Sequence, residues 1–190
     1  LKLQISTNVE AARAVEAEAT ALYWPAFGRT LLPEFALSRR DRGVANSPAD
    51  VLLSFGSGVL TRDIEALLLR HGLHTGIAFL HAERDREAPL AWDVIEPYRA
   101  PLVEGLVAYA VNNRVATMDH MAKREDGSWT IDADGRDRFI RAYESWIARP
   151  VRNRREGCDS LWRGLIESDI LALKRAFADD GVFAPYVMDY

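Results

Sequence analysis

The sequence predicts an all-α fold, a helical bundle with at most one short strand pair. Apolar residues recur with helical periodicity along most of the 190 residues, and residues that favour helix starts and stops stand at the ends of the periodic segments. Hydrophobic residues make up 48% of the chain, which is enough to bury the core of one domain. We therefore expect residues 1–190 to form a single helical domain.

The first predicted helix begins at a capping box formed by Thr7 and Glu10, and it ends near Tyr23, where Pro25 marks a break or kink. Its apolar stripe places Glu16 among alanines on the face that we expect to point inward. A carboxylate on such a face needs a partner. The alternative is a glutamate at the edge of the stripe that reaches water.

The middle of the chain contains two further helical segments. One begins with the capping sequence Ser-Pro-Ala-Asp at 47–50 and ends at Gly72, and its first half is apolar nearly all round. We expect this helix to be central and buried. The other covers 89–112 and should be kinked near Pro97. A short strand is predicted over 128–131.

The last third of the chain predicts a turn at 132–135, a short amphipathic helix at 136–148 and a final helix at 159–178. The arginine-rich run 149–157 lies between these two helices, and we expect it to be exposed.

Composition narrows the possible roles. A net charge of −4 argues against a protein that binds nucleic acid by charge alone, although all but three of the 24 basic residues are arginine, the better phosphate ligand. An arginine-rich genome would give the same bias. The single cysteine excludes an intrachain disulfide and fits a cytoplasmic location. No apolar run approaches the roughly 20 residues that cross a bilayer, so no membrane role is expected.

Metal-capable side chains are concentrated in residues 76–106. His81 follows the apolar run 77–80, and Asp93 and Glu96 stand three residues apart on one face of the next predicted helix. Two carboxylates and an imidazole among apolar residues indicate a divalent-metal site. The alternative is a loop histidine beside a solvated acidic edge.

Three stretches together resemble the CRISPR-associated Cas-one family, the metal-dependent DNA endonuclease and integrase of spacer acquisition. They are NSPADVLLSFGSGVL, GLHTGIAFLH and LAWDVIEPYRAPLV. Glu16, seven residues before Tyr23 with alanines between, fits the family's first ligand. The resemblance is good over residues 9–112 and holds in outline over 113–186. By the same resemblance, we expect residues 1–190 to correspond to the family's helical catalytic domain without its N-terminal β-rich domain, which makes much of the family's dimer contact.

The resemblance implies that Glu16, His81 and Glu96 bind Mg²⁺ or Mn²⁺ and that these three residues with Asp93 form the catalytic site for phosphodiester transfer on DNA. Asp93 would act through a water or orient His81, or it is only an acid favoured by a helix N-terminus. The implied partners are DNA, a Cas-two-type protein and a second copy of the chain. Two other classes stay open, a non-catalytic DNA- or partner-binding module and an unrelated helical metallophosphoesterase.

Seven arginines are candidates for contacts with the DNA backbone, because clustered guanidinium groups bind phosphate without reading sequence. The alternative for each cluster is a solvated loop. The candidates are Arg39, Arg40, Arg42, Arg99, Arg152, Arg154 and Arg155.

Overall fold

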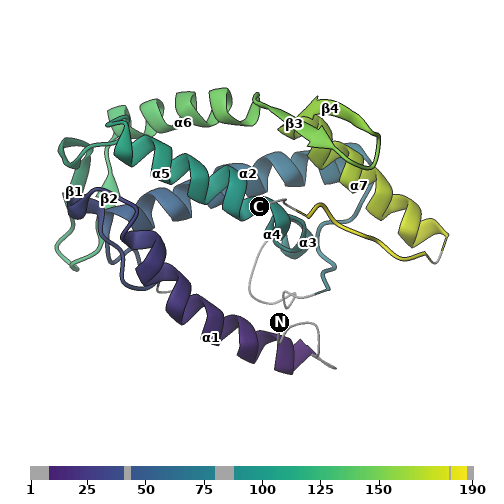
Figure 1. Cartoon of the computed structure of the whole chain (residues 1–190), viewed down its shortest axis with the longest axis horizontal. Coiled ribbons are helices and arrows are strands. Elements are labelled where there is room, and N and C mark those ends of the chain that lie inside the picture. Colours follow the sequence, from purple (N-terminus) through teal and green to yellow (C-terminus); the bar gives the residue numbers. More distant parts are fainter. Residues whose placement is uncertain (1–8, 41–43, 80–87, 180, 188–190) are drawn as a thin grey trace. The chain divides into compact units, whose positions relative to one another are not determined.

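The computed structural model describes residues 9–40, 44–79, 88–179 and 181–187, with side chains from residue 14 onward. The fold is predominantly helical, which confirms the predicted class (Figure 1). It contains two short antiparallel strand pairs, β1–β2 and β3–β4, where we expected at most one. No described helix is both long enough and apolar enough to span a bilayer.

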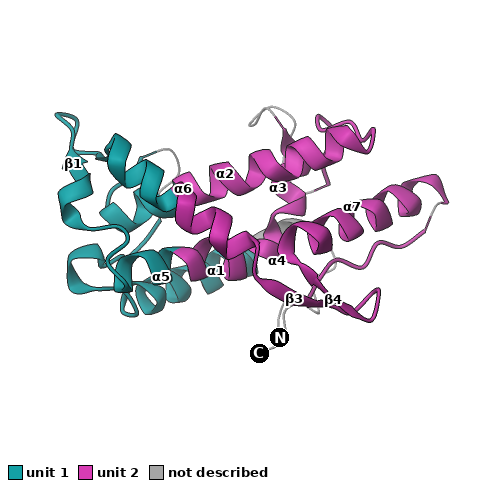
Figure 2. Ribbon diagram, turned by 90° about the horizontal axis from the view of Figure 1, so that it is seen from above, with its two compact units in different colours: residues 1–54, 107–139 teal, residues 55–106, 140–190 magenta. Residues whose placement is uncertain are grey.

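The chain divides into two compact units, each assembled from two separate stretches (Figure 2). Unit 1 consists of residues 1–54 and 107–139, and unit 2 consists of residues 55–106 and 140–190. We describe each unit by itself.

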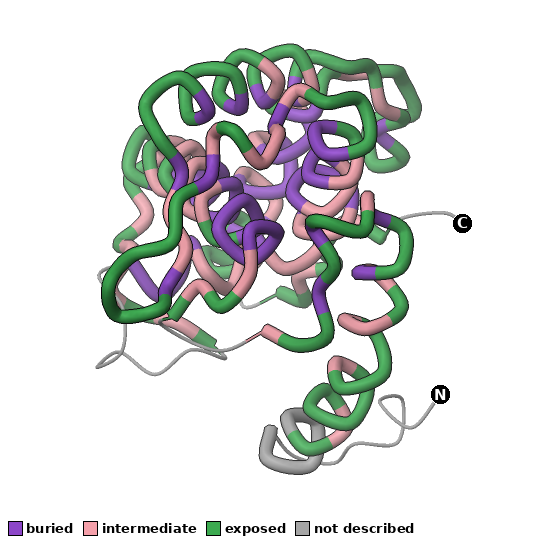
Figure 3. The backbone as a smooth tube through the Cα atoms, turned by 90° about the vertical axis from the view of Figure 1, so that its left-hand side faces the viewer, coloured by how far each residue is buried: buried purple, intermediate pink, exposed green. Residues whose placement is uncertain are grey.

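Unit 1 begins with helix α1 (Val9–Gly28), which runs through Pro25. The helix continues past the predicted end at Tyr23, and of the predicted break or kink at Pro25 the break is wrong. A proline inside a helix costs one hydrogen bond and crowds the carbonyl four residues earlier, but it need not end the helix. The helix ends at Gly28, where the backbone of Leu37 comes so close that a β-carbon would overlap it. Most of the described side chains of α1, from residue 14 onward, are exposed (Figure 3). Ala19 and Tyr23 of the stripe expected to face inward are among them.

The rest of unit 1 contains a 3-10 turn, η2 (Pro33–Phe35), the start of α2 (Pro48–Arg70), the end of α5 (Gly105–Asn112) and a second 3-10 turn, η4 (Met118–His120). Its core is formed by apolar side chains of these elements, among them Phe35, Leu52, Val107 and Ala110.

A small sheet completes unit 1. The predicted strand is β2 (Trp129–Ile131), and it pairs antiparallel with β1 (Met121–Lys123). The turn expected at 132–135 is instead the start of helix α6 (Ala133–Ile147). The Asp132 carboxylate accepts the N–H of Gly135 at 2.7 Å, which satisfies a donor that has no partner within the helix.

Unit 2 contains most of α2, which is buried as predicted: Leu60, Ile64 and Leu68 are inaccessible to solvent. The helix ends where predicted, with Gly72 at a backbone φ of +73° that suits glycine. The unit also holds α3 (Pro89–Val94), α4 (Glu96–Tyr98), the π-helical turn η3 (Arg99–Glu104) and α7 (Trp162–Ala178). The expected kink near Pro97 is thus a series of short helical pieces.

The arginine-rich run forms a hairpin that was not predicted from the sequence. Strands β3 (Pro150–Asn153) and β4 (Cys158–Leu161) pair antiparallel, with Gly157 at a φ of +70° in the turn. The sequence gives no signal for these strands, because side chains that stay mostly exposed show no hydrophobic alternation. The hairpin side chains remain largely exposed, as expected for this run.

Candidate metal and nucleic-acid site

Asp93 holds the segment that leads toward His81. Its carboxylate accepts the backbone N–H of Phe79 at 2.5 Å. The Phe79 ring stacks on Phe177 of α7, with ring centroids 5.5 Å apart. Asp93 lies near the end of α3, not in its first turn, so a favourable helix dipole does not explain its position. His81, two residues beyond Phe79, lies outside the described residues.

Glu96 opens α4 and is paired with a cation. Arg99 Nη1 lies 3.4 Å from Glu96 Oε2, and the two side chains are 27% and 34% exposed. The Nε atom of Arg99 is buried with no hydrogen-bond partner among the described residues. Glu96 is therefore a half-buried carboxylate that keeps access to solvent. Such a group can accept a metal or yield its arginine to a phosphate.

Tyr98 holds this turn from the opposite side. Its ring is 1% exposed, and its hydroxyl donates to Asp169 Oδ2 at 2.6 Å. Burial, and after it the negative charge of Asp169, raise the pKa of the Tyr98 phenol well above its ordinary value. The phenol is therefore a permanent donor to the carboxylate.

Asp169 is a buried acid that the sequence analysis missed. It is 3% exposed and also accepts Arg155 Nη2 at 2.9 Å and the backbone N–H of Tyr186 at 2.8 Å. A signal was available, because Asp169 stands in the inward stripe of the last helix, next to Ile166 and Ile170. A carboxylate in that position requires partners elsewhere in the fold.

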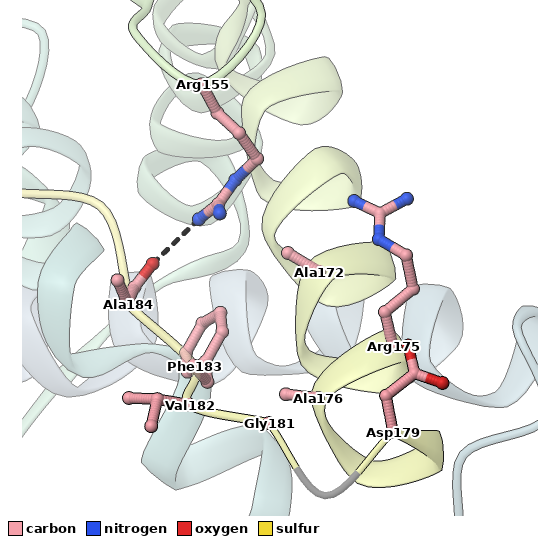
Figure 4. A pocket seen from close by; sticks show the side chains of 9 residues that line it. All are labelled: Arg155, Ala172, Arg175, Ala176, Asp179, Gly181, Val182, Phe183 and Ala184. Carbon is pink, nitrogen blue, oxygen red and sulfur yellow. Dashed lines mark hydrogen bonds between the residues drawn. The ribbon is translucent and has the colours of Figure 1, made fainter.

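Arg155 connects the hairpin turn to the segment after α7. Besides its ion pair with Asp169, its guanidinium donates to the carbonyl of Ala184 at 2.7 Å (Figure 4). A cavity of about 310 Å³ lies beside this contact, and α7 contributes Arg175 to its lining. Arg155, proposed from sequence as a DNA contact, is thus engaged within unit 2.

Glu16 belongs to unit 1 and is exposed, which corrects the expectation that it points inward. Helical periodicity shows which residues share a face, but it does not show which face the fold covers. Glu96 belongs to unit 2. Within each unit, the described residues contain no group of three His, Cys, Asp or Glu side chains placed to hold a metal. The predicted set of Glu16, His81 and Glu96 stays a prediction.

The other candidate arginines differ in how they are held. Arg40 pairs with the buried Asp50 at 3.1 Å and lies over the Trp24 ring, 5.1 Å from its centroid. Arg152 pairs with Asp159 on the neighbouring strand at 3.2 Å. Arg39 and Arg154 are exposed, and Arg42 lies outside the described residues.

Comparison with known families gives a match over three quarters of the sequence. The model of the family described as CRISPR associated protein Cas1 matches residues 1–145. A CRISPR-associated endonuclease Cas1 from Thermus thermophilus is 33% identical over 153 residues, covering 80% of this chain and 46% of that protein. A Cas4 exonuclease/Cas1 endonuclease fusion from Rhodospirillum rubrum is 31% identical over 173 residues, covering 87% of this chain and 30% of the fusion.

Solved structures share the fold. A CAS1 protein from Thermotoga maritima superimposes with a TM-score of 0.82 at 22% identity, covering 93% of this chain and 55% of that one. A casposase bound to its integration product gives a TM-score of 0.86 at 20% identity, covering 97% of this chain and 52% of that one. This chain spans about half the length of the curated relatives it matches. The family match contains Glu16, His81, Asp93 and Glu96, and we conclude that the chain belongs to the Cas1 family.

Proposed function

We propose that this chain is the catalytic part of a divalent-metal-dependent DNA endonuclease and integrase that acts in CRISPR spacer acquisition, an antiviral defence, in the cytoplasm. The observation that carries the proposal is the family match over residues 1–145, which contains every predicted ligand. Curated relatives carry the name endonuclease, and a casposase with the same fold is known bound to an integration product.

The donor set fits Mg²⁺ or Mn²⁺, because hard divalent ions prefer carboxylate oxygens and Mn²⁺ also accepts an imidazole. We assign Glu16, His81 and Glu96 as the ligands. When bound, the ion would polarise the scissile phosphate and stabilise charge on the leaving oxygen. Unit 2 supports this assignment with a half-buried Glu96 that reaches solvent and whose charge Arg99 partly compensates.

Asp93 and Arg99 have supporting roles in this proposal. Asp93 fixes the backbone two residues before His81 through the N–H of Phe79 and so limits where the imidazole can lie. Arg99 holds Glu96 until DNA arrives and then offers its guanidinium to a phosphate oxygen. The attacking group would be a DNA 3′-hydroxyl in integration and water in cleavage.

We further propose DNA, a Cas2-type protein and a second copy of this chain as partners. A complex named Cas6-RT-Cas1--Cas2 contains a chain of the same fold, with a TM-score of 0.87 at 23% identity. Arg39 and Arg154 are exposed and stay candidates for phosphate contact.

Glu16→Gln tests the ligand assignment on α1. We expect Mn²⁺-dependent cleavage of branched DNA to fall by about 100-fold or more, since even loss of a residue that only supports a ligand costs roughly 10- to 100-fold. The thermal midpoint should not change, because Glu16 is exposed and glutamine is a similar helix former. Glu18→Gln, an equally exposed change two residues along the same helix, should keep its activity. Equal losses in both variants would assign the effect to the surface of α1 and not to a ligand.

Arg154→Ala tests DNA contact by the hairpin. The logarithm of DNA affinity should fall less steeply with the logarithm of salt concentration, with the slope reduced by about one, as one phosphate contact is lost. The matched change Arg155→Ala should leave the slope unchanged and lower the thermal midpoint, because that guanidinium lies on the buried Asp169. The measurement is fluorescence anisotropy with labelled DNA over a salt series. A reduced slope for Arg155→Ala alone would reverse the two roles.

A further inference from the structure

The turn that carries Glu96 is helical but irregular. Helices α3 and α4 meet at Ile95, whose N–H still donates to the carbonyl of Ala91 at 3.0 Å, and the winding changes to the π-helical turn η3 at Arg99. Pro97 and Pro101 lie within this segment, residues 95–104, and neither has a backbone N–H to donate. Side-chain contacts from α6 and α7 add to its backbone bonds in fixing this turn.

Hydrogen bonds from α6 and α7 hold this turn from outside. Trp146 Nε1 of α6 donates to the carbonyl of Pro101 at 2.8 Å. Asp169 of α7 accepts the Tyr98 hydroxyl at 2.6 Å. Tyr98 is the nearer contact to the predicted ligand, since it follows Glu96 by two residues. Residues two apart lie on opposite sides of a helical turn. Tyr98 therefore holds the buried side, and Glu96 remains 34% exposed on the other.

Asp169 gathers donors from three separate segments. Tyr98 reaches it from α4, Arg155 from the hairpin turn, and the N–H of Tyr186 from the segment after α7. The Tyr186 ring also stacks on Tyr98, with centroids 5.9 Å apart and planes 7° from parallel. Because this carboxylate is 3% exposed and its oxygens are directed at fixed donors, it determines the position of Tyr98 closely.

We infer that Asp169, acting through Tyr98, is a positioning residue that holds the Glu96 carboxylate in place for its metal ion. The segment around Tyr186 completes this arrangement by closing over the same carboxylate. The inference rests on the proposed function, since it assigns a role relative to Glu96 as a ligand. By this inference, metal affinity depends partly on Asp169 of α7, which lies beyond residues 1–145, the range of the family match.

The test compares Tyr98→Phe with Tyr143→Phe, two variants that each lose one buried hydroxyl. Tyr143 is also 1% exposed, and it donates to Asp63 Oδ2 at 2.7 Å, a bond that joins α6 to α2 and not to the Glu96 turn. Both variants should lose similar stability. Only Tyr98→Phe should weaken Mn²⁺ binding, by roughly 10-fold, the effect typical of removing a group that orients a ligand.

Three measurements on the chain decide the matter: the thermal midpoint, the Mn²⁺ dissociation constant by isothermal titration without DNA, and DNA cleavage against Mn²⁺ concentration. In Tyr98→Phe, the Mn²⁺ concentration that gives half-maximal cleavage should rise, and the rate at saturating Mn²⁺ should return to that of the parent chain. A higher Mn²⁺ requirement with an unchanged rate at saturating Mn²⁺ indicates a misplaced ligand, whereas loss of folded protein would lower the rate at every Mn²⁺ concentration.

Equal Mn²⁺ affinity in the two variants, in a parent chain that binds Mn²⁺ and cleaves DNA, would overturn the inference and leave the proposed function intact. A parent chain that neither binds Mn²⁺ nor cleaves DNA would instead overturn the proposed function, and the inference with it.

Discussion

His81→Ala should yield a folded chain that no longer cleaves DNA with Mn²⁺. Removing one of three assigned protein ligands should reduce cleavage and strand transfer by about 100-fold or more, beyond the roughly 10- to 100-fold cost of losing a supporting group. The sequence places His81 in a charged segment after an apolar run, so we expect the thermal midpoint to change little. Both quantities should be measured on one preparation, with branched DNA as substrate.

His74→Ala is the matched control for this variant. His74 is exposed and accepts the backbone N–H of Gly76 at 3.1 Å, and no role in catalysis is assigned to it. Its replacement should leave cleavage within about twofold, as expected for a surface change far from special features. A folded His81→Ala chain with undiminished cleavage would falsify the assignment of that histidine as a ligand.

Asp169→Ala should cause the largest loss of stability in unit 2. It leaves the buried Tyr98 hydroxyl without its acceptor and the Arg155 guanidinium without its ion-pair partner, although that guanidinium keeps its bond to the carbonyl of Ala184. Breaking a buried ion pair from one side costs about 3–5 kcal/mol. Arg155 is 34% exposed, and water screens part of its charge, so we expect the lower end, about 3 kcal/mol, in the free energy of unfolding. Urea denaturation followed by circular dichroism measures it.

Asp159→Ala provides the comparison for Asp169→Ala. Asp159 also pairs with an arginine of the hairpin, but the two side chains are 61% and 75% exposed. An exposed pair contributes about 1 kcal/mol or less. Similar losses in the two variants would mean that the contacts of Asp169 are no stronger than a surface ion pair.

Helix α2 shows what could be predicted from the sequence. Its start at Pro48 and its end before Gly72 follow from local signals, a capping sequence and a glycine with positive φ, and the structure places both where expected. Local signals failed at the hairpin, because strand pairing between Asn153 and Cys158 depends on a turn and not on a hydrophobic pattern.

The residues of the candidate site also include some that the sequence indicates and some that only the fold brings together. Asp93 and Glu96 could be proposed because motif order and spacing are visible along the chain. Asp169 could not be linked to them, because it lies 71 residues after Tyr98, and only the fold brings the two side chains together. The inward direction assigned to Glu16 failed for a related reason. A periodic stripe does not specify which surface will cover it.

The interleaved make-up of the two units bears on how the protein is synthesised and how it can be dissected. Residues of unit 2 flank the second stretch of unit 1, so no single cleavage of the chain releases either unit whole. On the ribosome, unit 1 has all its residues once position 139 has emerged, whereas unit 2 must wait for the segment from 140 onward. The turn that carries Glu96 is therefore made well before the α7 carboxylate that holds it, and a nascent chain acquires its predicted metal ligands earlier than the means to position them.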